Sequence, residues 1–156
     1  MEPSTKVTTE YILTLHVPLD APQIASDNLQ IFNIRPGGWV NGLVRGEVVA
    51  PGADWLRIMS DGTRRLDVRL SIKTHDDAII LVTYQGRATA APPDVAQRLA
   101  AGETLGPDQI YFLTTPTFKT DAPAYAWLNH IVAVGKLVSF NREKDRHVTY
   151  DVFKVS

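Results

Sequence analysis

The sequence predicts an all-β domain: an antiparallel barrel or sandwich of nine or ten strands with one short helix. Hydrophobic residues recur at every second position in many short segments, and Pro, Gly or Asp residues separate those segments. A helical pattern is confined to a single segment. With 156 residues, 44% of them hydrophobic, the chain suits one core. We therefore expect residues 1–156 to form a single domain.

The first half of the chain contains most of the predicted strands. Residues 9–17 alternate between apolar and polar side chains, the period of a half-buried strand, and Pro18 ends them. Further strands are expected at 29–34, 42–50, 54–59, 65–73 and 78–85. Gly42 and Gly46 predict a sharp bend or bulge, which curls a sheet into a barrel. Asp61-Gly62 predicts a tight hairpin.

The second half contains the helix and the remaining strands. Residues 92–102 begin with two prolines, continue with good helix formers and end on a glycine, which predicts a helix of two to three turns. Strands follow at 109–115, 127–137 and 147–155. Many strands joined by short turns are typical of antiparallel barrels and sandwiches.

Composition argues against several classes of protein. The net charge is −1 and no run of Lys or Arg exceeds two, so nucleic acid is not an expected partner. The absence of cysteine excludes disulfides, thiol nucleophiles and thiolate zinc sites. No apolar stretch approaches the roughly 18 residues of a membrane span and no leader pattern is present. We therefore expect no membrane partner and a cytoplasmic location.

Motifs that bind common cofactors are also missing. The chain has no phosphate-binding glycine loop, dinucleotide fingerprint or nucleophile elbow. Its four histidines do not occur in metal-binding pairs. We expect a protein that uses no cofactor and no metal.

An ordered set of motifs gives the chain a family resemblance. The motifs are Gly52-Ala53-Asp54-Trp55, Asp61-Gly62-Thr63, Leu66-Asp67-Val68-Arg69, Gly86-Arg87, the run from Tyr111 to Phe118, and the run from Tyr125 to Asn129. From about Phe32 to the C-terminus the chain resembles the domain of unknown function 3237 family of small bacterial and fungal proteins. The resemblance implies a calycin-like β-barrel with a short surface helix. It also implies a possible activity, because some members look like cofactor-independent lyases or decarboxylases of lignin-derived aromatic acids.

Four residues are candidates for catalysis. Alternation places Asp67 and Arg69 on the polar face of one strand, which is either the wet outside of the barrel or the lining of a cavity. In a cavity, Arg69 would hold a substrate carboxylate and Asp67 would orient it. Tyr84 and Tyr111 are either core aromatics with satisfied hydroxyls or proton donors to a substrate.

Seven further residues are candidates for substrate binding because they are aromatic or polar and lie in or near the motifs. They are Trp39, Trp55, Arg87, Thr114, Phe118, Trp127 and Asn129. Aromatic walls suit a flat aromatic ligand, although they suit a barrel core equally well.

Three hypotheses about function remain open. The first is a cofactor-free lyase, a decarboxylase of a phenolic or aryl-substituted carboxylic acid. The second is a barrel that binds a small aromatic metabolite without changing it, and the third is a scaffold without a pocket. An exposed strand, or the N-terminal strand, could also support a homo-oligomer.

Overall fold

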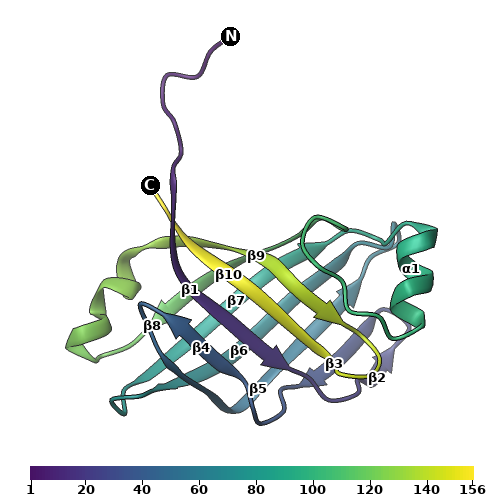
Figure 1. Ribbon diagram of the computed structural model, residues 1–156, viewed down its shortest axis with the longest axis horizontal. Helices are drawn as coiled ribbons and strands as arrows, with labels where there is room; N and C mark the ends of the chain where they lie inside the picture. The colour runs from purple at the N-terminus through teal and green to yellow at the C-terminus, as the bar shows by residue number, and fades with distance from the viewer.

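Ten antiparallel strands form one sheet that closes on itself in the computed structural model, which describes residues Met1–Ser156 (Figure 1). The strands are β1 (Thr9–Pro18), β2 (Gln23–Ser26), β3 (Leu29–Asn33), β4 (Trp39–Gly42), β5 (Gly46–Ile58), β6 (Arg64–Thr74), β7 (Ile79–Ala88), β8 (Phe112–Lys119), β9 (Val132–Asn141) and β10 (His147–Val155). Their order is β2-β3-β5-β4-β1-β10-β9-β8-β7-β6, and pairing of β6 with β5 closes the barrel. Eight strands enclose the interior, and β2 and β3 extend the sheet beyond β5.

Strict alternation explains why these segments form barrel strands. Along β6, Leu66, Val68 and Leu70 are buried, whereas Asp67 and Arg69 between them are exposed. The inward side chains of the strands join in one core of 26 buried residues. Burial of this apolar surface is the main stabilising contribution to the barrel. The predicted all-β barrel with a short helix is confirmed.

Several predicted boundaries are wrong, and the strand expected at 109–115 lies at Phe112–Lys119. Pro51-Gly52 does not end a strand, because β5 runs through it with a shift of register between Val49 and Ala53. The predicted strand 127–137 begins only at Val132, since Pro123–His130 form a 3₁₀ helix, η1. Prolines favour the first turn of a helix, and Tyr125 and Leu128 are the side chains that η1 buries.

Gly42 and Gly46 flank the turn from β4 to β5 and do not bend a continuous strand. Gly42 has a φ of +141°, a conformation that favours glycine, and Gly46 is pressed against β6. A Cβ on Gly46 would overlap the carbonyl oxygen of Lys73 and lie 2.8 Å from the Cα of Thr74. Only glycine permits this approach of the two backbones.

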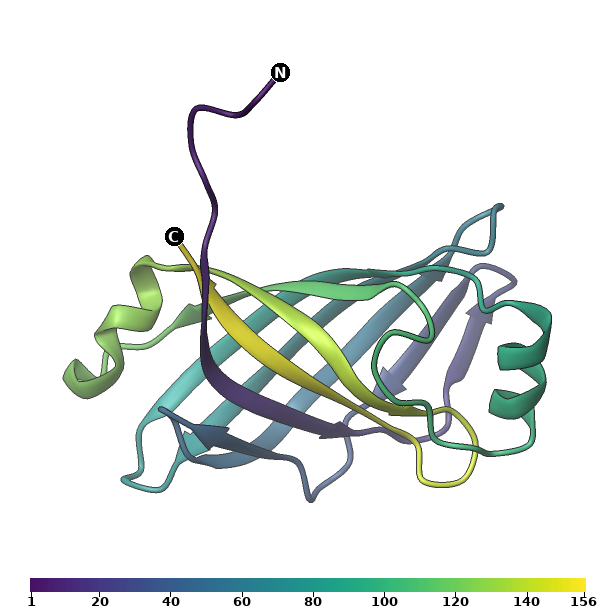
Figure 2. The same ribbon diagram turned by 45° about the horizontal axis from the view of Figure 1, so that its top comes forward.

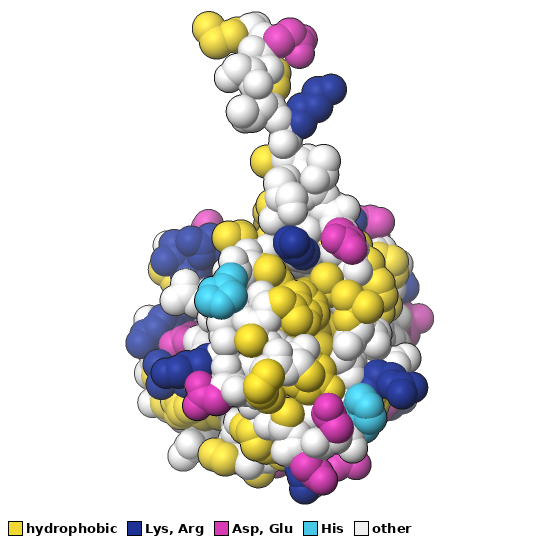
Figure 3. Space-filling view, turned by 90° about the vertical axis from the view of Figure 1, so that its left-hand side faces the viewer, with side chains coloured by type: hydrophobic (Ala, Val, Ile, Leu, Met, Phe, Trp, Pro, Cys, Tyr) yellow, Lys and Arg dark blue, Asp and Glu magenta, His cyan; other side chains and the backbone are white.

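The two helices lie at opposite ends of the barrel (Figure 1). Helix α1 (Pro93–Ala100) follows β7 and packs Val95 and Leu99 against Leu105, close to the predicted range of 92–102. At the other end, Trp127 of η1 and Val132 of β9 are exposed, and Figure 3 shows apolar side chains gathered on this end. Neither helix has the length and apolar character needed to cross a bilayer.

The first residues of the chain form an arm that projects from the barrel (Figure 2). Residues 1–8 are exposed along their whole length. The arm joins the body where the backbone amide of Thr8 donates to the carbonyl of Ser156.

Candidate functional site

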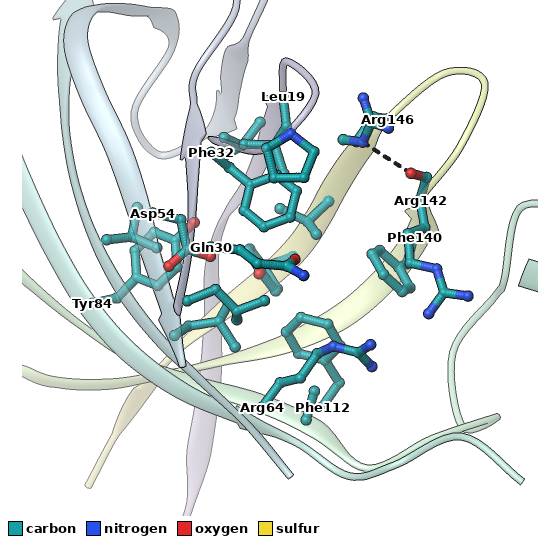
Figure 4. A pocket seen from close by; sticks show the side chains of 18 of the residues that line it. Leu19, Gln30, Phe32, Asp54, Arg64, Tyr84, Phe112, Phe140, Arg142 and Arg146 are labelled. Carbon is teal, nitrogen blue, oxygen red and sulfur yellow. Dashed lines mark hydrogen bonds between the residues drawn. The ribbon is translucent and has the colours of Figure 1, made fainter. Parts of the chain in front are cut away.

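A cavity of about 420 Å³ lies inside the barrel (Figure 4). It lies in the half where α1 connects β7 to β8, because Ala88 at the end of β7 and Phe112 at the start of β8 line it. It is lined by 19 residues, 12 of them hydrophobic, which come from β1, β3 and β5 to β10 and from the adjoining loops. A mostly apolar lining with a few polar groups is typical of small-molecule sites. The barrel interior is therefore not filled by side chains, whereas the third hypothesis, a scaffold without a pocket, expects a filled interior.

Asp54 is the acidic side chain at the inner end of this cavity. Strand β5 directs it inward together with Leu56, and only 7% of it is exposed. In the strand ladder Asp54 pairs with Val68, which pairs in turn with Tyr84, so the three form a row across β5, β6 and β7. The backbone amide of Asp67 donates a hydrogen bond of 3.0 Å to Oδ1 of Asp54.

The surroundings of Asp54 favour its protonated form. Burial raises the pKa of Asp54 from 3.8 to about 7, against the opposing effect of the Asp67 amide. Near pH 7 the carboxyl group therefore exists in both protonation states, which suits a general acid or base.

Two tyrosine rings lie beside Asp54. Tyr84 and Tyr150 are buried and meet edge to face, with ring centroids 5.6 Å apart. Burial raises the pKa of both phenols, and the negative charge of Asp54 adds to the effect, so both remain neutral hydroxyl groups. Oη of Tyr150 is fully buried and forms no hydrogen bond of normal geometry, and its nearest polar neighbour is the hydroxyl group of Tyr84, which also raises the pKa of Tyr150.

Three arginines surround the outer end of the cavity, and we call them the mouth arginines: Arg64, Arg142 and Arg146. Arg64 begins β6, and the other two belong to the turn between β9 and β10. Nε of Arg146 donates to the carbonyl oxygen of Arg142 at 2.9 Å. Burial lowers the pKa of Arg64, and the charge of Arg142 lowers it further. Figure 4 shows the mouth arginines across the cavity from Asp54 and Tyr84.

Of the four candidate catalytic residues, only Tyr84 lines the cavity. Asp67 and Arg69 are exposed on the outer face of β6, because Leu66, Val68 and Leu70 take the inward positions. The alternative in which this face lines a hollow is therefore wrong, and Asp67 meets the site only through its backbone amide. Tyr111 is exposed just before β8.

None of the seven predicted binding residues lines the cavity. Trp39, Trp55 and Trp127 have exposed side chains, and Trp39 borders a separate outer groove beside Arg35. Arg87 is exposed on β7. Two others are buried elsewhere in the barrel, Thr114 and Phe118. Asn129 has a structural role, since its side chain bonds the backbone amide and carbonyl of Thr120.

The residues that sequence reasoning missed carry a recognisable signal. Asp54 alternates in phase with Leu56, and Tyr150 with Val148 and Val152, so each is a polar group on the apolar face of its strand. Such a position predicts a buried polar side chain, which is a candidate for function. The mouth arginines carry no such signal, because their convergence depends on the closure of the barrel.

The closed antiparallel barrel and its acid-bearing cavity define a class of small barrels with an internal cavity. Within that class, the family model described as protein of unknown function (DUF3237) matches residues 7–155, and the chain belongs to this family. A UPF0311 protein of Bradyrhizobium diazoefficiens is 33% identical over 150 residues, which cover 94% of this chain and 95% of that protein.

Two solved structures resemble the barrel over its whole length. A conserved protein of unknown function from Rhodopseudomonas palustris has a TM-score of 0.86 and 29% identity, with all of both chains covered. A protein from Acinetobacter baumannii described as β-barrel-like has a TM-score of 0.76 and 28% identity, also with full coverage of both chains.

Proposed function

We propose that this protein is a cofactor-independent lyase that decarboxylates a small aryl-substituted carboxylic acid inside the barrel. The observation that carries the proposal is Asp54, a buried carboxyl group with a pKa of about 7 at the inner end of an apolar cavity. A proton donor in such surroundings is what decarboxylation without a cofactor requires.

The inner end of the cavity favours loss of carbon dioxide. A substrate carboxylate there meets apolar walls and neutral hydroxyls, those of Tyr84 and Tyr150, while the guanidinium groups lie across the cavity (Figure 4). Removal of the carboxylate from water raises its free energy more than that of the transition state, in which its charge is dispersed. Tyr84 lines this end of the cavity with a neutral hydroxyl group, which can orient the carboxylate.

The proposed step balances with Asp54 as the general acid. The bond between the carboxylate carbon and its neighbour breaks, its electron pair stays on the neighbouring carbon, and carbon dioxide leaves. Asp54 in its protonated form transfers its proton to that carbon and becomes a carboxylate. A proton from solvent then restores the acid, so the net change is RCOO⁻ plus H⁺ to RH plus CO₂.

Binding without conversion is the second candidate, and the largely apolar lining favours it. In that case Asp54 and the tyrosines would only select the ligand. Released carbon dioxide and a changed ligand mass separate the two functions, since a carrier returns its ligand unaltered.

The test is turnover of a panel of aryl carboxylic acids, followed by CO₂ release and mass spectrometry. We expect Asp54→Asn to lower kcat by about 10²–10⁴-fold, the usual contribution of a general acid, while ligand binding persists. Asp121→Asn, an equivalent change at an exposed aspartate before η1, should leave turnover intact. Full activity in Asp54→Asn overturns the mechanism, and an unchanged ligand with every acid overturns the lyase.

A further inference from the structure

The mouth arginines form a cationic cluster that the protein itself leaves almost uncompensated. Nε of Arg142 lies 3.6 Å from Oε1 of Glu143, whose side chain is 46% exposed. Neither Arg64 nor Arg146 forms an ion pair with an acidic side chain. Exposed ion pairs contribute little, so the Glu143 contact does not neutralise the cluster.

This cluster belongs to the cavity and not to the general surface. All three residues line the cavity together with Glu143, Phe112 and Phe140, and Arg64 is partly buried. The three positive charges outnumber the one negative charge at this end. Like charges that converge at a partly desolvated site raise the free energy of the free protein. An anionic ligand group removes that cost, and guanidinium forks bind carboxylates with charge-assisted hydrogen bonds.

The position of the cluster fixes where the anionic group of a ligand lies. Figure 4 shows Asp54 and Tyr84 on one side of the cavity and the three guanidinium groups on the other, with Gln30 and Phe32 between them. A cavity of about 420 Å³ is at the small end of the range for ligand sites, so one molecule with one or two rings can occupy both sides.

We infer that the ligand carries a second anionic oxygen group, a carboxylate or a phenolate, which the mouth arginines bind at the end opposite the group that faces Asp54. The statement that the inner group reacts rests on the proposed lyase function, whereas binding of the outer group rests on the cavity alone. The substrates are then aromatic acids with two acidic ends. The mouth arginines set specificity and do not touch the reacting atoms.

The test compares pairs of probes that differ only in the outer charge. We would measure the affinity of Asp54→Asn protein, in which any turnover should be strongly slowed, for terephthalate, its monomethyl ester, 4-hydroxybenzoate and biphenyl-4,4′-dicarboxylate. We expect a diacid to bind at least about tenfold more tightly than its monoester, equivalent to one charge-assisted hydrogen bond. The hydroxybenzoate, whose phenol is neutral near pH 7 and ionises at higher pH, shows whether a phenol or only its phenolate can replace the second carboxylate when affinity is measured across pH. The biphenyl probe tests length.

Variants assign the preference to the mouth. Adding Arg64→Ala and Arg142→Ala should abolish the preference for the diacid and leave the monoester affinity within about twofold. Arg57→Ala, an exposed arginine on the outer face of β5, should leave both affinities unchanged. Arg64→Lys keeps the positive charge and should retain part of the preference for the diacid. This variant tests the role of the charge if the alanine variant folds poorly. Circular dichroism checks folding of each variant.

The outcomes separate this inference from the proposed function. Equal affinity for diacid and monoester, or a preference that survives loss of both arginines, overturns the inference. A diacid preference in a protein that releases no carbon dioxide from any acid supports the mouth site and removes the lyase.

Discussion

Asp54 occupies a position where the alternation of β5 requires an inward side chain, and that placement determines its chemistry. The same burial that makes the carboxyl group useful near pH 7 costs stability, because a buried carboxylate loses its hydration. Active sites commonly retain such unfavourable groups. The cost is measurable, since it depends on pH.

The stability of the protein should fall with rising pH in a way that Asp54 controls. The pKa of Asp54 is about 7 in the folded protein and has its ordinary value of 3.8 in the unfolded chain. Between these two pH values the folded protein therefore holds a proton that the unfolded chain has released. The stabilisation that this extra bound proton gives the folded state is fully present below about pH 4 and is lost as the pH rises through about 7.

Asp54→Asn cannot ionise and should lose this dependence. Its free energy of unfolding, relative to wild type, should increase by about 2–3 kcal/mol between pH 5 and pH 8, at 1.36 kcal/mol for each pH unit over which the protonation states differ. Urea denaturation at pH 5, 6, 7 and 8 measures the difference. Parallel curves for the two proteins would show that Asp54 is ionised throughout.

The strands differ in how well the sequence predicts them, and the reason is physical. Period-two alternation is a local property, so β1, β6, β7 and β10 could be found from their own residues. The apolar run from Trp127 looks like a strand, but its first part forms η1, where Tyr125 and Leu128 are buried. A preference for burial does not distinguish these two geometries over so few residues.

The candidate site was less predictable than the strands. The alternation of Leu66, Val68 and Leu70 indicates which face of β6 points inward. One of the two interpretations of this strand accordingly placed Asp67 on the outside, where the structure has it. Arg64 and Arg142 are far apart in the chain and meet only because the sheet closes. No local pattern contains that information.

The turn from β4 to β5 depends on Gly46, and its replacement tests how tightly the strands are joined. Gly46→Ala should lower the free energy of unfolding by about 2–3 kcal/mol, because the new Cβ meets the backbone of β6, which cannot move aside as a side chain can. Gly106→Ala is the control, since a Cβ there meets nothing within 4 Å, and it should change stability by less than about 1 kcal/mol. Equal effects of the two changes in chemical denaturation would contradict the close approach.

The whole molecule is organised with its cavity toward α1 and its exposed apolar side chains around η1 (Figures 1 and 3). The projecting arm is independent of both. Its residues bury no side chain, and its first backbone bond to the barrel is made at Thr8. We therefore expect the barrel to fold without it.

Deletion of residues 1–7 should leave the barrel intact. We expect the Tm to change by less than about 2 °C, because exposed terminal residues contribute little to stability. Differential scanning calorimetry checks the Tm, and size-exclusion chromatography with light scattering checks the mass. A large loss of stability together with a smaller particle would show instead that the arm holds copies of the chain together.

The row formed by Asp54, Val68 and Tyr84 across three neighbouring strands has a consequence for how activity is lost. Hydrogen bonds between the strand backbones set the spacing of these residues, so the proposed proton donor and the phenol are kept together by the same contacts that maintain the barrel. A slip of one residue between β5 and β6 would turn Asp54 away from its neighbours and expose apolar side chains at once. Each molecule whose barrel is damaged should therefore lose its function completely. A partly denatured sample should contain fewer functional molecules, and their specificity should be unchanged.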